Sequence, residues 1–260
     1  MNLDLTGKKA IVCGSTQGIG RAAAVELASL GSALTLVARD ESSLEEVRGS
    51  LPGNAAHDTV CADFDERGDL QRKIVAHVEE NGPFHILVNN SGGPPPGEIA
   101  TADSEAFLKA FSRLLLCNQI MAQEVLPGMK SEKYGRIINI ISTSVKQPIP
   151  NLGVSNTTRG AVASWAKTLS REVAPFGITV NNILPGTTNT GRLFSLFQEM
   201  ADKRDVSSDV IANEWKSEIP AGRIAEPEEI AYAIAFLASP AAAYINGINL
   251  PIDGGRLLTL

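Results

Sequence analysis

Three glycines in the segment Gly14-Ser15-Thr16-Gln17-Gly18-Ile19-Gly20 are spaced for binding a phosphate group. The segment stands between the apolar run 10–13 and an apolar-periodic stretch. A buried strand that leads into a glycine turn and then a helix leaves unpaired N–H groups at the positive end of the helix dipole. Gly14 allows the turn, Gly18 lets a phosphate approach the backbone, and Gly20 lets the helix pack on the strand. The pattern predicts a dinucleotide site, with a flexible loop as the alternative.

Polar residues also follow the next two predicted strands, where parallel sheets bind their ligands. Arg39 follows the strand 33–38, at a place where NAD-binding proteins of this architecture usually carry an acidic residue. A guanidinium matches a 2′-phosphate, so Arg39 favours NADP(H), although Asp40 beside it leaves NAD(H) open and a solvated arginine is the alternative. Asp63 follows the strand 59–62 and is suited to accept from the adenine amino group, or else to cap a helix or turn.

The elements that position these residues alternate between strand and helix patterns along the whole chain. Strands are predicted at 10–13, 33–38, 59–62, 86–88, 136–141, 179–183 and 248–250. Their continuous apolar character indicates that both faces of the sheet are covered. The predicted fold class is α/β, a single Rossmann-type doubly wound parallel sheet with helices on both faces, spanning residues 1–260 as one domain because no linker divides them.

Composition narrows the class of ligand. The 260 residues are 43% hydrophobic and carry a net charge of −6 without a basic patch, which disfavours nucleic acid and anionic membrane as partners. The N-terminus lacks the apolar core of a signal peptide, and the longest apolar run, 230–238, is too short for a bilayer span. Cys13, Cys61 and Cys117 lack metal-ligand spacing, so we expect buried thiols in a reducing cytoplasm, no metal site, and a small-molecule ligand.

With these residues in view, the chain resembles the short-chain dehydrogenase/reductase family, closest to the 3-oxoacyl-acyl-carrier-protein reductase type, over nearly its whole length. Five segments carry the resemblance, in order and in register: Gly14 to Gly20, Asn89-Asn90-Ser91-Gly92, Gly135 to Ser142, Asn181 to Gly186, and Ile252-Asp253-Gly254-Gly255.

The resemblance implies a role for several of these residues. In the family, the glycine turn holds the cofactor phosphates and the segment Asn89-Asn90-Ser91-Gly92 supports the adenosine side. The residues after Pro185-Gly186 bind the nicotinamide carboxamide, a role that falls here on Thr188, with Thr190 near the pyrophosphate.

The chain departs from the family at its catalytic positions. Family members reduce a carbonyl with a Tyr-x-x-x-Lys pair that begins thirteen residues after the active serine. Counting from Ser142 gives Ser155 and Arg159 in place of the tyrosine and lysine. Leu114 stands where the family has an asparagine. Of the four catalytic positions, only the serine is kept.

This exchange changes the available chemistry. An aliphatic alcohol is a far poorer acid than a tyrosine, and a guanidinium stays protonated, so Arg159 can bind ribose hydroxyls or an oxyanion but cannot shuttle a proton. Ser155 and Arg159 share one helix face and, with Ser142, can polarise a carbonyl or hold an anion in an oxyanion-hole arrangement. Lys146, four residues past Ser142, is a candidate to move the proton if burial lowers its pKa; a surface lysine is the alternative.

No tyrosine or histidine is expected to replace the missing acid. Tyr134 precedes the strand that Ser142 follows, roughly 26 Å away along that strand. The remaining tyrosines and histidines lie away from the predicted strand ends, and we expect structural or solvated roles for the histidines: Tyr232, Tyr244, His57, His77 and His85.

Two further segments border the predicted site. The loop 92–97 contains Pro94-Pro95-Pro96 between glycines and is predicted to roof the nicotinamide side, or else to be a rigid connector. The region 188–220 corresponds to the substrate lid of the family. Its apolar residues recur at helical spacing and favour a hydrophobic or acyl-like substrate, with core packing or a subunit contact as the alternative: Leu193, Phe194, Leu196, Phe197, Met200 and Trp215.

Two functional hypotheses follow. The first is an NADP(H)-linked oxidoreductase for an apolar carbonyl or alcohol, in which Ser142, Ser155 and Arg159 orient the oxygen while Lys146 or water moves the proton. The second is a catalytically silent NADP(H)-binding homologue with a regulatory or structural role. Halohydrin dehalogenases, relatives that also have an arginine in place of the lysine, keep the tyrosine and lose the glycine turn, so chemistry of that kind is not favoured.

The resemblance also implies an assembly. Family members form homotetramers, or homodimers, through the helices around 104–130 and 155–175 and through the last helix with its strand. Leu257, Leu258 and Leu260 are residues that a neighbouring subunit could cover. We expect a cytoplasmic homo-oligomer.

Overall fold

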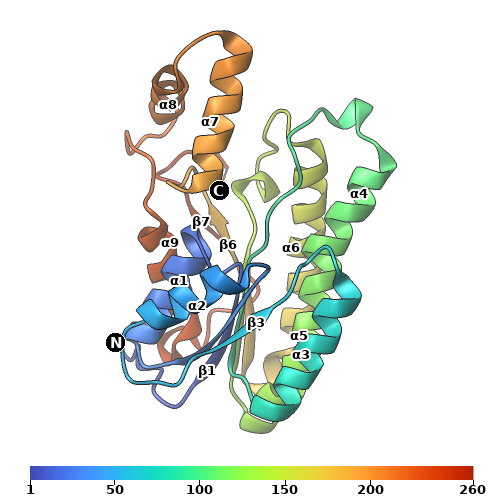
Figure 1. Cartoon of the computed structure of the whole chain (residues 1–260), viewed down its shortest axis with the longest axis vertical. Helices are drawn as coiled ribbons and strands as arrows, with labels where there is room; N and C mark the ends of the chain where they lie inside the picture. The colour runs from blue at the N-terminus through green and yellow to red at the C-terminus, as the bar shows by residue number, and fades with distance from the viewer. Residues whose placement is uncertain (260) are drawn as a thin grey trace.

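Seven parallel strands form one sheet in residues 1–259, the part of the chain that the computed structural model describes (Figure 1). Leu260 lies outside the described residues. The strands are β1 (Lys9–Cys13), β2 (Ala33–Ala38), β3 (Asp58–Cys61), β4 (Ile86–Asn89), β5 (Gly135–Ile140), β6 (Ile178–Pro185) and β7 (Asn249–Ile252). Their order in the sheet is β3-β2-β1-β4-β5-β6-β7. Each predicted strand is present: β2 has the predicted ends, and the ends of the other strands differ by at most two residues because pairing with neighbours sets the ends.

Helices cover both faces of the sheet. They are α1 (Gly18–Ser29), α2 (Glu41–Ser50), α3 (Arg67–Asn81), α4 (Ser104–Phe111), α5 (Cys117–Glu132), α6 (Gly153–Val173), α7 (Gly191–Arg204), α8 (Ser208–Ser217) and α9 (Pro227–Ala238). Figure 1 shows α1, α2 and α9 on one side and α3, α5 and α6 on the other. Successive side chains of β1 point to opposite faces of the sheet, so the sheet has a hydrophobic core on each face. Val12 packs in the core beneath α1, α2 and α9, whereas Ile11 and Cys13 pack in the core beneath α3, α5 and α6. The predicted fold class is confirmed.

The strand order reverses between β1 and β4. The chain moves outward from β1 through β2 to β3 and then returns to place β4 on the other side of β1. Loops that leave the carboxyl ends of β1 and β4 therefore diverge, which is where doubly wound sheets bind their ligands.

The helices α7 and α8 stand away from the sheet and pack on each other (Figure 1). Most of the apolar stripe predicted for this region is used in that packing, since Leu193, Phe197 and Ile211 are buried in one cluster. The rings of Phe197 and Trp215 meet edge to face at 5.4 Å. The alternative of core packing therefore accounts for much of the stripe, whereas Phe194 is 62% exposed.

Two expectations about the chain concern cysteine and membranes. Cys13 and Cys117 are buried free thiols as expected, and Cys61 is half-buried. No helix within residues 1–259 has the length and apolar content that crossing a membrane would require.

Candidate functional site

The glycine turn between β1 and α1 is held against the end of β4. Gly14 has a φ of +61°, in the left-handed region that favours glycine. A Cβ on Gly20 would lie 2.0 Å from the Gly14 carbonyl oxygen, so α1 can begin this close to β1 only with glycine there. Asn90 Nδ2 donates to the same carbonyl oxygen at 3.3 Å. The turn is therefore tied to the loop after β4.

The turn presents donors that suit a phosphate group. Gln17 is the N-cap of α1, and no side chain accepts from the first N–H groups of that helix. The Ser15 hydroxyl is fully buried and has no hydrogen-bond partner among residues 1–259. Thr190 lies against the turn: if Gly18 carried a Cβ, that atom would lie 3.0 Å from Thr190 Cγ2. A bound pyrophosphate would accept hydrogen bonds from these uncapped N–H groups and from the unsatisfied hydroxyl.

The remaining residues of the turn border this place. Thr16 is half-buried and Gln17 is exposed, whereas Ile19 packs partly into the core beneath α1. The side chain of Thr190 also caps α7, since its Oγ1 accepts from Leu193 N at 3.4 Å.

Arg39 is exposed directly after β2, beside the glycine turn. Asp40, the residue that left NAD(H) open, is the N-cap of α2, and its carboxylate accepts from Ser43 N at 2.7 Å. Hydrogen bonds from Ser43 and Ser42 lower the pKa of Asp40 to about 2. The Asp40 carboxylate is therefore engaged by its own helix, while the Arg39 guanidinium stays exposed at the strand end.

Asp63 lies at the carboxyl end of β3, where its Oδ1 accepts from Asp65 N at 2.9 Å. This hydrogen bond is the turn-capping role that the sequence left as the alternative. Asp63 is half-buried and follows the strand that pairs with β2.

Four asparagines form a chain across the sheet, a structural role that the sequence analysis gave to none of them. Asn89, Asn139, Asn182 and Asn249 occupy matching positions of β4, β5, β6 and β7. Each of the first three donates through Nδ2 to Oδ1 of the next, at 2.8 to 2.9 Å. Buried side-chain amides linked in this way fix the relative height of the strand ends. The signal was an asparagine near the end of four predicted strands.

The predicted catalytic residues Ser142, Ser155 and Arg159 meet at the carboxyl end of β5. Arg159 donates from Nε to Ser155 Oγ at 3.2 Å. Its Nη1 donates to the carbonyl oxygens of Ile140 and Ile141 at 3.3 and 2.7 Å, directly before Ser142. Ser142 Oγ accepts from the backbone N of Ser144 at 3.1 Å. The guanidinium thus joins the first turn of α6 to the end of β5.

Lys146 ends the short 3₁₀ turn Thr143–Val145 that follows Ser142. Its backbone N donates to the Thr143 carbonyl oxygen at 3.0 Å, and the residue is half-buried. The structure therefore places Lys146 in the loop above the sheet, as expected.

The loop after β4 is anchored from two sides. Gly97 pairs with the segment before α6, where its N donates to the Asn151 carbonyl oxygen at 2.7 Å. Arg192, in the first turn of α7, donates to the carbonyl oxygens of Gly93 and Pro94 at 3.0 and 3.2 Å. Ser91 is half-buried and Gly92 is exposed at the start of this loop. The loop therefore contacts both the segment before α6 and the first turn of α7.

No tyrosine or histidine among residues 1–259 lies where the missing acid would be needed. The Tyr134 hydroxyl donates to the Ala238 carbonyl oxygen at 2.7 Å, while Tyr232 and Tyr244 are 57% and 102% exposed. Each histidine forms a hydrogen bond near the amino end of β1 or β2, away from the carboxyl ends where the predicted site lies. His57 accepts from Leu34 N, His85 accepts from Lys9 N, and His77 bonds to Thr35 Oγ1. Burial lowers the pKa of all three histidines.

Leu114 occupies the π-helical turn Ser112–Leu116 between α4 and α5. Its side chain is buried against Ile141, Val162 and Leu184. An apolar cluster therefore fills the place where the resemblance puts a polar asparagine.

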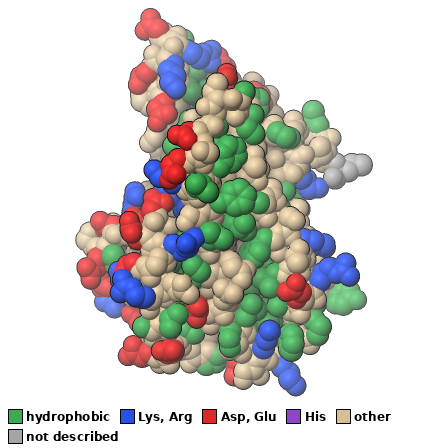
Figure 2. Space-filling view, turned by 90° about the vertical axis from the view of Figure 1, so that its right-hand side faces the viewer, with side chains coloured by type: hydrophobic (Ala, Val, Ile, Leu, Met, Phe, Trp, Pro, Cys, Tyr) green, Lys and Arg blue, Asp and Glu red, His purple; other side chains and the backbone are tan. Residues whose placement is uncertain are grey.

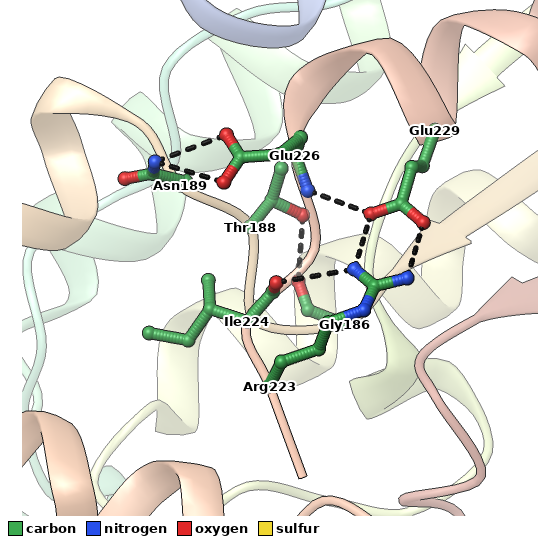
Figure 3. Close-up of polar contacts among 7 residues, drawn as sticks. All are labelled: Gly186, Thr188, Asn189, Arg223, Ile224, Glu226 and Glu229. Atoms are coloured by element: carbon green, nitrogen blue, oxygen red, sulfur yellow. Dashed lines mark hydrogen bonds and ion pairs between the residues drawn. The ribbon is translucent and has the colours of Figure 1, made fainter. Parts of the chain in front are cut away.

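The segment after β6 is fastened to α9 (Figure 3). The hydroxyl of Thr188 donates to the Gly186 carbonyl oxygen at 3.1 Å, and Asn189 Nδ2 donates to both oxygens of Glu226. Arg223 forms a bidentate ion pair with Glu229, at 2.6 Å for each bond. Gly186 also packs on β7, since a Cβ there would lie 2.7 Å from Asp253 Cα. Pro185 and Gly186 thus lead into a segment before α7 that is held by these contacts.

A parallel sheet with an uncapped helix N-terminus and a glycine turn at its switch point defines a dinucleotide-binding α/β protein. A family model described as enoyl-(acyl carrier protein) reductase matches residues 14–256. The chain belongs to the short-chain dehydrogenase/reductase family, in the branch that this model describes.

Relatives cover the whole chain. The 3-oxoacyl-[acyl-carrier-protein] reductase FabG of Vibrio cholerae is 32% identical over 258 residues, which are 98% of this chain and 100% of FabG. The NADPH-dependent reductase BacG of Bacillus subtilis is 28% identical over 259 residues, 98% of this chain and 100% of BacG. The L-sorbose reductase of Gluconobacter frateurii, solved with NADPH and L-sorbose, superposes with a TM-score of 0.94 at 30% identity and full coverage of both chains. The relatives are oxidoreductases, and their substrates range from acyl carriers to a sugar.

Proposed function

We propose that this chain is an NADP(H)-linked short-chain oxidoreductase that interconverts a carbonyl and an alcohol. The observation that carries the proposal is the glycine turn, with its uncapped helix N-terminus and its buried, unsatisfied Ser15 hydroxyl. NADP(H) is favoured over NAD(H) because Arg39 is exposed while the Asp40 carboxylate is engaged in capping α2. The NADPH dependence of the B. subtilis and G. frateurii relatives supports the same choice.

NADPH, when bound, supplies the hydride for the carbonyl carbon. Ser142 and Ser155 donate hydrogen bonds to the carbonyl oxygen, and the adjacent Arg159 charge stabilises negative charge that develops there. Arg159 remains protonated at neutral pH and acts as a fixed positive charge, so the proton for the oxygen comes from Lys146 or from water. Thr188 and Thr190 position the cofactor beside them, from the joint at the base of α7. In the reverse direction the same residues hold the alcohol oxygen.

We propose an apolar part for the substrate. A cavity of about 580 Å³ lies between α7 and α8 and is lined in part by Leu193, Phe194 and Phe197. A lid formed by residues 188–220 would close over that apolar part.

The test is the loss of NADPH absorbance against a panel of β-ketoacyl thioesters and quinones. We expect slow turnover with at least one apolar carbonyl, because the absence of a positioned acid costs on the order of 10² to 10⁴ in rate. NADH should support less turnover than NADPH. No oxidation of NADPH with any member of this panel or with short 2-, 3- and 4-oxo acids would reject the proposal.

The second candidate, a catalytically silent NADP(H)-binding protein, is favoured by two observations. Arg159 already donates hydrogen bonds from Nε to Ser155 and from Nη1 to carbonyl oxygens at the end of β5. Leu114 places an apolar side chain where the family has its catalytic asparagine. Calorimetry separates the two functions: tight NADPH binding without turnover, combined with a change in affinity for a partner protein, supports the silent one.

A further inference from the structure

Two arginines from different elements point at one place beside the predicted catalytic residues. A Cβ on Gly93 would lie 2.9 Å from Arg159 Nη2 and 3.3 Å from Arg192 Nη2. Arg159 comes from α6 and Arg192 from α7, and both guanidinium groups lie beside Gly93 in the loop after β4. Glycine at position 93 leaves room for both.

Neither guanidinium has an acidic partner within residues 1–259. By contrast, six other arginines each form an ion pair with a carboxylate: Arg48 with Glu45, Arg72 with Asp69, Arg113 with Asp65, Arg204 with Glu214, Arg223 with Glu229, and Arg256 with Glu218. Arg159 and Arg192 donate to backbone carbonyl oxygens and to Ser155 instead. Two like charges therefore share one place without a counterion.

The electrostatics are consistent with this arrangement. Burial lowers the pKa of Arg159 to about 10, with a further contribution from the Arg192 charge. Burial and the charge of Arg113 lower the pKa of Arg192, and Glu199 offsets this only in part. Both groups remain cations at neutral pH, and an anion between them would relieve their repulsion.

We propose that Arg159 and Arg192 bind a carboxylate of the substrate, which makes the substrate an oxo acid or the corresponding hydroxy acid. The inference rests on the proposed oxidoreductase function and names its substrate class. A carboxylate fits because it has two oxygens, one for each guanidinium, and charge-assisted hydrogen bonds of this kind are strong. Arg159 also contacts Ser155 through Nε, so the carboxylate and the carbonyl oxygen are held by neighbouring atoms of one side chain.

The experiment compares short 2-, 3- and 4-oxo acids with their methyl esters, in the wild type and in Arg192→Gln. In the wild type, kcat/KM for the best acid should exceed that of its ester by about 30-fold or more, as expected for a hydrogen-bonded charge pair. Arg192→Gln should bring that ratio close to one, and Arg192→Lys should retain part of it. Lys203→Gln, which removes an exposed positive charge from the same helix, should leave the ratio unchanged.

Two further readouts separate the possible failures. If Arg192→Gln weakens NADPH binding tenfold and leaves the acid-to-ester ratio intact, the arginines hold a cofactor phosphate and the inference is overturned while the oxidoreductase stands. If no compound is turned over, calorimetric binding of the acids and esters to the NADP⁺-loaded protein decides: preference for the acid supports the carboxylate site in a silent protein, and equal or undetectable binding overturns it.

Discussion

Ser155 and Arg159 lie one helical turn apart, and the hydrogen bond between them determines what each can do. The Ser155 hydroxyl accepts from Arg159 Nε, so its own proton is free to be donated to a substrate oxygen. The serine is a weak acid, and the guanidinium beside it does not titrate near neutral pH. The pair is therefore suited to binding an oxygen and poorly suited to protonating it.

At this scale we predict that the double variant Ser155→Tyr with Arg159→Lys gains reductase activity. A phenol beside an ammonium group restores a proton donor, and kcat with the best carbonyl substrate should rise by about 10²-fold. The measurement is steady-state NADPH oxidation, with Ser155→Ala plus Arg159→Lys as the control that lacks the phenol. Equal rates for the two double variants would contradict the prediction.

A second prediction at the residue scale concerns Gly20. The Cβ of Gly20→Ala would overlap the Gly14 carbonyl oxygen, so the start of α1 must move away from β1. We expect NADPH affinity to fall by at least about tenfold and the free energy of unfolding to fall by roughly 1–3 kcal/mol. Calorimetry and denaturant unfolding measure the two effects. Gly49→Ala, in α2 with open space around its Cβ, should leave both unchanged or slightly increase stability.

At the scale of elements, the position of the proposed lid, residues 188–220, depends on how α9 begins. Glu226 and Glu229 form a capping box at the N-terminus of α9, and Glu226 also binds Asn189 at the start of the lid segment (Figure 3). The Arg223 guanidinium and the backbone N–H of Glu226 lower the pKa of Glu229 to about 2. One helix start thus ties the lid to the sheet through exposed polar groups.

Glu229→Gln should therefore lower the Tm at pH 7 by about 2 °C, a small effect because the ion pair is solvent-screened. The folded pKa of Glu229 lies below its unfolded value of about 4.3, so its stabilisation is present above that pH and is lost as the pH falls towards 2. The difference in Tm between wild type and variant should shrink over that window in scanning calorimetry. Glu228→Gln, on the same helical turn without an ion pair, should show no such difference. A difference that persists at pH 2.5 would count against this account.

At the scale of the whole molecule, the face that carries α3 to α6 is the one we propose for assembly. Figure 2 looks onto this side and shows hydrophobic side chains gathered along it. Leu108 and Leu116 are 65% and 40% exposed in the segment 104–130 named by the resemblance, and at the C-terminus Leu258 is 89% exposed. Exposed apolar side chains of this kind favour a subunit contact.

We predict a native mass that is a multiple of the 27.5 kDa chain. Leu116→Glu should shift the protein towards monomer, because a charge at the centre of an apolar contact is not compensated. Light scattering after size-exclusion chromatography measures the mass. Val210→Glu, an exposed apolar position on α8, serves as the control and should leave the assembly intact. A monomeric wild type at micromolar concentration would refute the assembly.

The fold was readable from the sequence because its signals are local. Apolar runs between glycine or polar turns predicted each strand, and the segment from Gly14 to Gly20 predicted the cofactor class, since strand, turn and helix are adjacent in the chain. The apolar stripe after residue 188 was ambiguous for the same reason. Periodicity shows that one face of α7 is buried but not what covers it, and α8 turned out to cover most of it.

Other features were decided only by the tertiary structure, because they join residues far apart in the chain. The hydrogen bond from Ser43 N to the Asp40 carboxylate shows that this carboxylate caps α2, and the sequence alone did not distinguish that role from binding the ribose of NAD(H). The asparagine chain likewise depends on the strand register. Arg192 and the Gly93 carbonyl oxygen are 99 positions apart. The sequence alone therefore determined the doubly wound sheet and its dinucleotide turn, which follow from local backbone preferences, whereas the pairing of two unneutralised guanidinium groups depended on how α6, α7 and the loop after β4 pack together.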